Sequence, residues 1–179
     1  MARVPLRRQD DLPDDYQYLL GEDALGELNL LCAMANNPDA LQSYMRYGTT
    51  LWSDGGLEAD DLERCILTIA RELEAVYEWH QHVPIARESG VSDDEILAIA
   101  DGDRDRFDER ETALLRYVEA VVRDEVDDDR FAALSEWFEP TEIVGITLIA
   151  THYLATARFL SALEVPLEDS FVGWDLEGE

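Results

Sequence analysis

Hydrophobic residues recur at intervals of three and four along most of the chain, which is the period of an amphipathic helix. No strand-like alternation of apolar and polar residues flanks a hairpin turn. No low-complexity linker divides the chain either, so the pattern predicts one all-α domain over residues 1–179, with about seven or eight helices.

Capping signals place several helix boundaries. Asn37-Pro38 combines an N-cap residue with proline at the first helical position, while Ser92-x-x-Glu95 and Asp108-x-x-Glu111 form capping boxes. Apolar spacing predicts a helix from Ala24 to Met34 and a long one from Pro140 to about Leu163. Two further helices are indicated by Leu62, Cys65, Ile66, Ile69 and Leu73, after a break at Gly55-Gly56, and by Phe131, Leu134 and Phe138.

The longest apolar stretch, from Ile143 to Ala157, is interrupted by polar residues and is too short to cross a bilayer. We therefore predict a buried core helix and no membrane association. The last dozen residues, with Phe171 and Trp174, are expected to dock on a surface, and a neighbouring subunit is one candidate for it.

Acidic residues outnumber basic ones by 41 to 14, which gives a formal net charge of −27, and every basic residue is arginine. Such a charge fits either a cationic partner or a surface adapted to concentrated salt. The acids are spread over every segment, so we favour a salt-adapted, halophile-like source. A nucleic-acid partner is not expected, because phosphate contacts need clustered basic residues.

The two cysteines, Cys32 and Cys65, each lie within an apolar helical pattern. Two cysteines are too few for a fold held together by disulfide bonds, and buried free thiols are common in cytosolic proteins. The N-terminal residues lack the apolar core of a signal peptide, so we expect a cytoplasmic protein.

Reactive side chains concentrate between Glu63 and Pro84. Glu78 and His82 are four residues apart and therefore neighbours on one helix face, where a carboxylate orients an imidazole and raises its basicity. This pairing suits general acid/base chemistry, although a solvated helix pair has the same spacing. His80 and His82 point to different faces, and no metal site is predicted.

Glu63 lies fifteen residues before Glu78. On an uninterrupted helix the two would be roughly 22 Å apart along the axis, too far to act together. The intervening residues 70–76 contain neither glycine nor proline, so the sequence gives no sign of a bend. Pro84 marks either a kink in the helix or the first turn of a new one.

The run from Tyr77 to Ile96 resembles the core motif of the carboxymuconolactone decarboxylase family, within the alkylhydroperoxidase D-like superfamily. Ala33-Met-Ala-Asn-Asn-Pro-Asp resembles the family's "LA-x-NP" segment, and residues 152–166 resemble its closing helix. The resemblance implies the superfamily's compact helical fold, a helix break that brings Glu63 close to His82, and assembly as a homotrimer or hexamer.

Alkylhydroperoxidase D carries a glutamate followed by Cys-x-x-Cys-x-x-x-His. Aligning His82 with that histidine aligns Glu63 with the glutamate and places Ala75 and Glu78 at the two cysteine positions. Both thiols of the motif are therefore absent, and Cys65 lies ten residues before Ala75. Thiolate attack on a peroxide needs the sulfur, whereas the decarboxylase branch of the family works without the cysteine pair.

The leading hypothesis is a decarboxylase-like protein that performs proton transfer on a small organic acid or lactone, without a cofactor. His82, oriented by Glu78, is the expected acid/base and Glu63 completes the relay. The expected substrate contacts are Tyr77, Trp79 and, from the resemblance, Arg158 as a carboxylate ligand. Two alternatives remain open: a thiol peroxidase that uses Cys65 or Cys32, and a non-catalytic binding or scaffold protein.

Overall fold

The computed structural model describes residues 1–177, and within them it contains eight α-helices, two 3-10 helices and no strand. The all-α prediction is confirmed. The 3-10 helices are η1 (Gln9–Asp11) and η2 (Asp14–Leu20), and the α-helices are α1 (Asn29–Met34), α2 (Pro38–Asp54), α3 (Ala59–Glu72), α4 (Val76–Glu88), α5 (Asp93–Asp101), α6 (Glu109–Arg123), α7 (Asp128–Ser135) and α8 (Pro140–Leu163).

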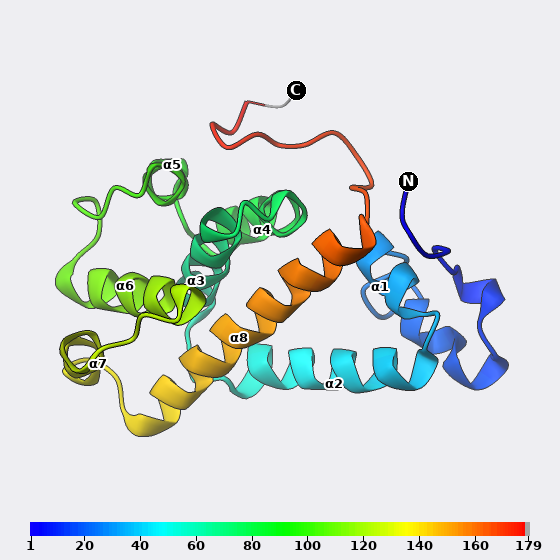
Figure 1. The fold of residues 1–179 in the computed structure, drawn as a ribbon, viewed down its shortest axis with the longest axis horizontal. Helices are drawn as coiled ribbons and strands as arrows, with labels where there is room; N and C mark the ends of the chain where they lie inside the picture. The colour runs from blue at the N-terminus through cyan, green and yellow to red at the C-terminus, as the bar shows by residue number, and fades with distance from the viewer. Residues whose placement is uncertain (178–179) are drawn as a thin grey trace.

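The long helix α8 runs diagonally through the molecule and separates two groups of elements (Figure 1). It packs against α2, α3 and α6, and Ile146, Ile149 and Ala150 are almost fully buried in that contact. By length and composition α8 could cross a membrane, but 56% of its most apolar window is buried inside the protein. The predicted core helix is thus present at the predicted position.

The capping signals mark true helix ends. Asn37 accepts a hydrogen bond from the amide of Ala40, and both predicted capping boxes are formed. The helix expected from Ala24 to Met34 was wrong in its first half. The chain turns at Gly26, whose φ of +68° has left-handed geometry, and α1 begins only at Asn29.

The bend between α3 and α4 occurs at Glu74, which takes a φ of +49°. The amide of Ala75 donates to the carbonyl of Ala70 at 2.7 Å, so a left-handed residue closes α3 in the manner of a C-terminal glycine cap. The two helices then pack against each other. Pro84 lies inside α4, so it does not start a new helix.

Helix α3 is anchored by the buried Arg64. Its guanidinium lies 2.8 Å from Asp60, 3.2 Å from Asp61 and 2.8 Å from Glu95 of α5. A further ion pair at 3.4 Å reaches Glu111 of α6. Buried charges are costly unless they are paired and hydrogen-bonded, and this network meets that requirement while it fixes α3 against two neighbouring helices.

The C-terminal segment runs past α4 (Figure 1), and its packing against the core cluster that contains Trp79 confirms that it docks on a surface. The surface belongs to the same chain. Trp79 Nε1 donates to the carbonyl of Gly173 at 2.9 Å, and the rings of Trp79 and Trp174 lie 5.0 Å apart. Phe171 and Trp174 are half-buried against this part of the core.

Candidate functional site

His82 lies between two carboxylates, one from each helix of the α3–α4 bend. Its Nδ1 is 3.0 Å from Glu63 Oε2, and its Nε2 is 3.6 Å from Glu78 Oε2. Because α4 folds back along α3, residues 19 positions apart come into hydrogen-bond distance. The three residues predicted to be catalytic therefore form one cluster.

This cluster is almost fully buried. Glu63, Glu78 and His82 are all buried, and Glu63 has no exposed surface at all. Each carboxylate keeps one oxygen, Oε1, buried without a hydrogen-bond partner among the described residues. A buried unpaired polar atom costs free energy of about 1–3 kcal/mol, so these two oxygens are positions where a water molecule or a ligand could donate a hydrogen bond.

Burial and charge shift the titration of the cluster. Burial raises the pKa of Glu78 to about 7; the charge of His82 opposes this rise and that of Glu63 adds to it. Burial acts to lower the pKa of His82, but the hydrogen bond to Glu63 and the two carboxylate charges outweigh it, so that this pKa lies above its ordinary value. Glu78 thus exchanges its proton close to neutral pH.

The geometry corrects the roles expected for the two carboxylates. Glu63 accepts the hydrogen bond from His82 Nδ1–H and therefore orients the ring, whereas Glu78 was expected to do so. Glu78 faces the opposite ring nitrogen at a distance slightly too long for a hydrogen bond. His82 Nε2 and Glu78 are consequently the pair left available for proton exchange.

Two aromatic residues that the sequence did not single out complete the surroundings of His82. The ring of Tyr153 on α8 meets it edge-on at 5.2 Å, and Trp52 near the end of α2 lies at 6.0 Å. Trp52 Nε1 donates to the Tyr153 hydroxyl at 2.9 Å, which joins α2 to α8 above the cluster. Trp52 is 40% exposed and thus lies on the solvent side of the site.

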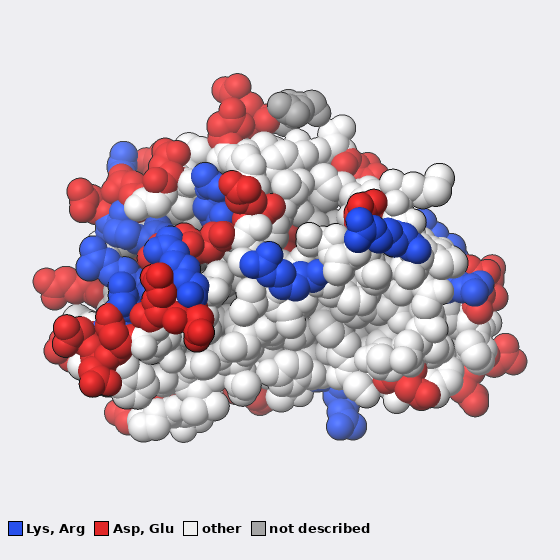
Figure 2. All heavy atoms as spheres, viewed as in Figure 1, with Lys and Arg blue, Asp and Glu red and all other residues white. Residues whose placement is uncertain are grey.

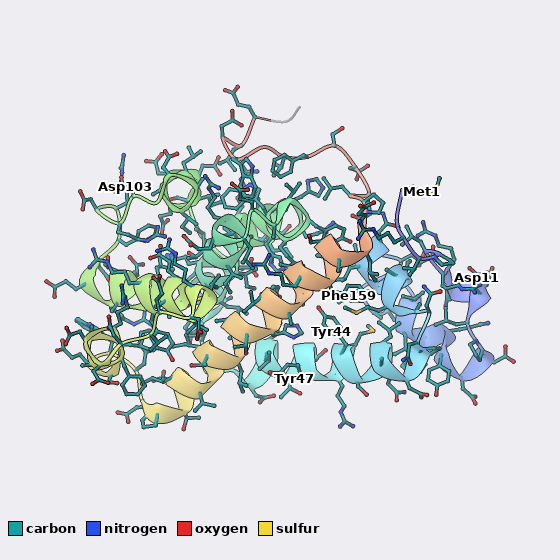
Figure 3. The ribbon with its side chains drawn as sticks, in the orientation of Figure 1. Met1, Asp11, Tyr44, Tyr47, Asp103 and Phe159 are labelled. Carbon is teal, nitrogen blue, oxygen red and sulfur yellow. The ribbon has the colours of Figure 1, made fainter. Side chains whose placement is uncertain are left out.

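The third histidine, His152, continues this aromatic group away from His82. It contacts Tyr153 at 5.3 Å, Tyr44 at 4.9 Å and Tyr47 at 5.2 Å between ring centroids. Figure 3 places both labelled tyrosines on α2 where α8 passes it. Burial lowers the pKa of His152, so this imidazole is neutral near pH 7. In the sequence, the one sign of this aromatic group was the series of aromatic residues along α2, together with the adjacent rings of His152 and Tyr153 on α8.

The structure does not bring the three predicted substrate contacts to this cluster. Trp79 is fully buried in a core contact with the C-terminal segment, and Tyr77 donates to Glu168 at 2.6 Å. Arg158 is exposed on α8, on the side away from Tyr153. Glu78, which lies between Tyr77 and Trp79 in sequence, reaches the site, but a helix turns adjacent side chains in different directions.

Tyr77 has a structural role instead. Helix α1 has no side-chain N-cap of its own, and the Tyr77 hydroxyl accepts from the amide of Leu30 at 3.1 Å. Glu168 accepts from the amide of Asn29 at 2.5 Å and from Gln81 Nε2 at 2.8 Å. Tyr77 and Glu168 thus cap α1 together and tie the C-terminal segment to α4, the helix that carries Glu78 and His82.

The thiols lie in the core. Cys32 and Cys65 are free and fully buried, and burial raises the pKa of both. Arg8 Nη1 donates to Cys32 Sγ at 3.5 Å, but neither thiol is accessible, and a reactive thiolate needs access to its substrate. Over residues 1–177, no group of three or more His, Cys, Asp or Glu side chains is arranged to hold a metal ion.

The sequence was also compared with known proteins. Residues 38–120, just under half of the chain, match the carboxymuconolactone decarboxylase family. This segment includes Glu63, Glu78 and His82. No curated protein matches the chain significantly.

Several solved structures share the fold. A peroxidase-related protein from Silicibacter sp. TM1040 has a TM-score of 0.81 at 20% identity, with 96% of this chain and 94% of that one covered. The alkylhydroperoxidase AhpD core protein from Ralstonia eutropha JMP134 has a TM-score of 0.77 at 21% identity, with 94% and 93% covered. The debrominase Bmp8 in complex with 2,3,4-tribromopyrrole has a TM-score of 0.79 at 17% identity, with 94% and 92% covered.

Residues 38–120, which carry the buried Glu63–His82–Glu78 cluster, thus match the carboxymuconolactone decarboxylase family, and the described chain has the alkylhydroperoxidase D-like helical fold.

Proposed function

We propose that this protein is a carboxymuconolactone decarboxylase-like enzyme that transfers protons on a small organic acid or lactone. The observation that carries the proposal is the buried cluster in which His82 is held by Glu63 and faces Glu78, whose pKa is about 7. An acid/base group is most effective when its pKa is close to the working pH. No accessible thiol accompanies the cluster in the described part of the chain.

The chemistry is proton transfer at a carbon next to a carbonyl. Ionised Glu78 or neutral His82 takes a proton from that carbon, the C–H electron pair moves into the carbonyl as an enolate, and the protonated group returns a proton to the same or another carbon. An enolate left by loss of CO2 is protonated in the same way, and solvent then restores the proton. Glu63 keeps the imidazole in one tautomer and stabilises its protonated form.

The thiol peroxidase alternative is disfavoured by the burial of Cys32 and Cys65. The non-catalytic alternative predicts a cluster that binds a ligand without turnover.

We also propose that the protein works in the cytoplasm as a homo-oligomer. Around the groove between α7 and α8, which has a volume of about 550 Å³, Phe131, Val144 and Leu148 are exposed. Exposed apolar patches on soluble proteins mark association sites. Light scattering in concentrated salt tests this proposal, and a monomer mass contradicts it.

Deuterium incorporation from heavy water tests the proposed reaction without knowledge of the natural substrate. A panel of small lactones and unsaturated or β-keto acids is incubated with the protein, and exchange at carbon is followed by NMR. We expect His82→Ala to slow the exchange by about 10²–10⁴-fold, the range of general acid/base catalysis. His80→Ala is the matched control, since His80 lies outside the cluster on the same helix. Equal rates for both variants, or no exchange with any compound, contradict the proposal.

A further inference from the structure

We infer that this site selects an uncharged ring that donates a hydrogen bond, and that it disfavours a substrate carrying a carboxylate. The inference deepens the proposed function and takes from it only that the ligand binds at His82. It narrows the proposed substrates to lactones and other uncharged carbonyl compounds, in which the enolate arises by removal of a proton and not by loss of CO2. It rests on the charges, the unpaired oxygens and the aromatic side chains of the cluster.

The charge balance of the cluster opposes an anion. Glu63 and Glu78 contribute two carboxylates, and His82 is the one basic side chain in contact with either of them among the described residues. The nearest arginine in sequence, Arg64, is fully engaged by acids of α3, α5 and α6. Like charges repel strongly where water is excluded, so a ligand carboxylate is destabilised beside this pair.

Arg158, the residue expected to hold a carboxylate, lies on the exposed side of α8 and has no ion pair or hydrogen bond within residues 1–177. Arg71 donates to the carbonyl of Ala100 and packs over the ring of Trp174, so it too is committed elsewhere. The buried site thus has no bidentate arginine, the group best suited to fix a carboxylate.

The two unpaired carboxylate oxygens favour a ligand that donates a hydrogen bond. Glu63 Oε1 and Glu78 Oε1 are buried acceptors without a partner, on the two sides of the His82 ring. A site with unpaired acceptors binds a ligand with an O–H or N–H donor more tightly than an analogue that lacks the donor. The neutral ligand gains this hydrogen bond without adding charge to the cluster.

The aromatic side chains favour a planar ring. Tyr153 and Trp52 both lie against His82, and Trp52 is partly exposed. Its single described hydrogen bond, to the Tyr153 hydroxyl, holds it over the cluster. Aromatic side chains beside a ligand site favour a planar ring, whose polar edge would face the unpaired oxygens.

Three probes separate the two requirements: phenol has the ring and the donor, anisole lacks the donor, and benzoate carries the charge. Equilibrium binding to the full-length protein is measured by calorimetry at pH 8 and pH 6 at one ionic strength. We expect phenol to bind at least ten times more tightly than anisole or benzoate at pH 8. The gap to benzoate should narrow at pH 6, where Glu78 is protonated.

Two variants sharpen the test. Glu78→Gln removes one charge, and we expect it to reduce the discrimination against benzoate at pH 8, whereas Glu88→Gln on the exposed part of α4 should leave it unchanged. Benzoate binding as tightly as phenol, anisole binding as tightly as phenol, or no binding by any probe at millimolar concentration each overturns the inference. Binding is measured without turnover, so the outcome of this test does not depend on whether the proposed reaction is observed.

Discussion

At the scale of single residues, the buried Glu78 couples the stability of the protein to pH. Its folded pKa of about 7 lies above the ordinary value of 4.5, and the folded pKa of His82 also lies above its ordinary 6.5. The folded state therefore binds more protons than the unfolded state from about pH 5 upward, so both groups lose stabilisation as the pH rises.

Glu78→Gln removes the contribution of Glu78 to this dependence, because the amide stays neutral at every pH. The free energy of unfolding of the variant minus that of the wild type should increase by about 2–3 kcal/mol between pH 5 and pH 8, because the wild type loses stability over this range. The size follows from about 1.4 kcal/mol per pKa unit. Urea unfolding across that range measures it. Glu88→Gln serves as the exposed control on α4, and parallel pH curves for wild type and Glu78→Gln contradict the prediction.

The two cysteines give a second prediction at this scale. Because Cys32 and Cys65 are fully buried and burial raises the pKa of each thiol, neither is an accessible thiolate. We expect two titratable thiols after unfolding in guanidinium, and the same number when the folded protein has first been exposed to hydrogen peroxide. Loss of one or both thiols in the folded state restores the peroxidase hypothesis.

The sequence predicted the members of the cluster but not the role of each. The i, i+4 spacing correctly made Glu78 and His82 neighbours, yet spacing does not say which ring nitrogen a carboxylate reaches. Only the return of α4 along α3 gives Glu63 the shorter contact. Trp52 and Tyr153 escaped notice because they come from helices far away in sequence, and their packing against His82 is a tertiary effect.

At the scale of elements, the C-terminal segment holds α4, the helix that carries Glu78 and His82, through Glu168. Glu168→Ala removes hydrogen bonds to Asn29, Tyr77 and Gln81. Because Glu168 is exposed, we expect a loss of stability of about 1–2 kcal/mol, below the sum of three charged hydrogen bonds. Hydrogen exchange of the first amides of α1 should accelerate. Asp169→Asn, an exposed acid next in the chain, should change neither quantity, and unchanged exchange in Glu168→Ala rules out the capping role.

The contact of α8 with the end of α2 depends on Gly145. A Cβ atom there would lie 1.8 Å from the carbonyl oxygen of Gly55, a backbone atom that cannot move aside alone. Gly145→Ala should therefore destabilise the fold by about 1–3 kcal/mol, typical of an overpacked contact, and shift Trp52 relative to Tyr153. Urea unfolding and tryptophan fluorescence measure both effects. The exposed neighbour Val144→Ala is the control, and a stable Gly145→Ala protein contradicts the close approach.

Helix boundaries that depend on local capping were predictable, and those that depend on tertiary packing were not. Asn37, Ser92 and Asp108 cap their helices as expected because their side chains bond amides three residues away. The end of α3 is different. Glu74 takes a left-handed conformation normally left to glycine, so no residue type signalled the bend that brings Glu63 to His82.

At the scale of the whole molecule, the charge is distributed unevenly over one face. In Figure 2 acidic and arginine side chains gather over α5, α6 and α7, while the surface over α8 and α2 is largely uncharged. Several of these charges pair, as in Arg123 with Glu72 at 2.7 Å and Arg87 with Asp93 at 2.6 Å. Fourteen arginines can neutralise only a minority of 41 acids, so the folded protein retains strong self-repulsion.

Salt should therefore stabilise this protein. The distance over which charges interact in solution falls from roughly 10 Å in 0.1 M salt to about 3 Å in 1 M, which removes most repulsion between exposed acids. We expect the free energy of unfolding to rise steadily from 0.1 to 2 M NaCl. A variant with Asp128→Asn and Asp129→Asn, two exposed acids of α7, should need less salt for the same stability. Stability that is constant or falls with NaCl contradicts the salt-adapted interpretation. The buried Glu63–His82–Glu78 cluster, shielded from the ions, should keep its pH dependence throughout the titration, because salt screens buried pairs much less than exposed ones.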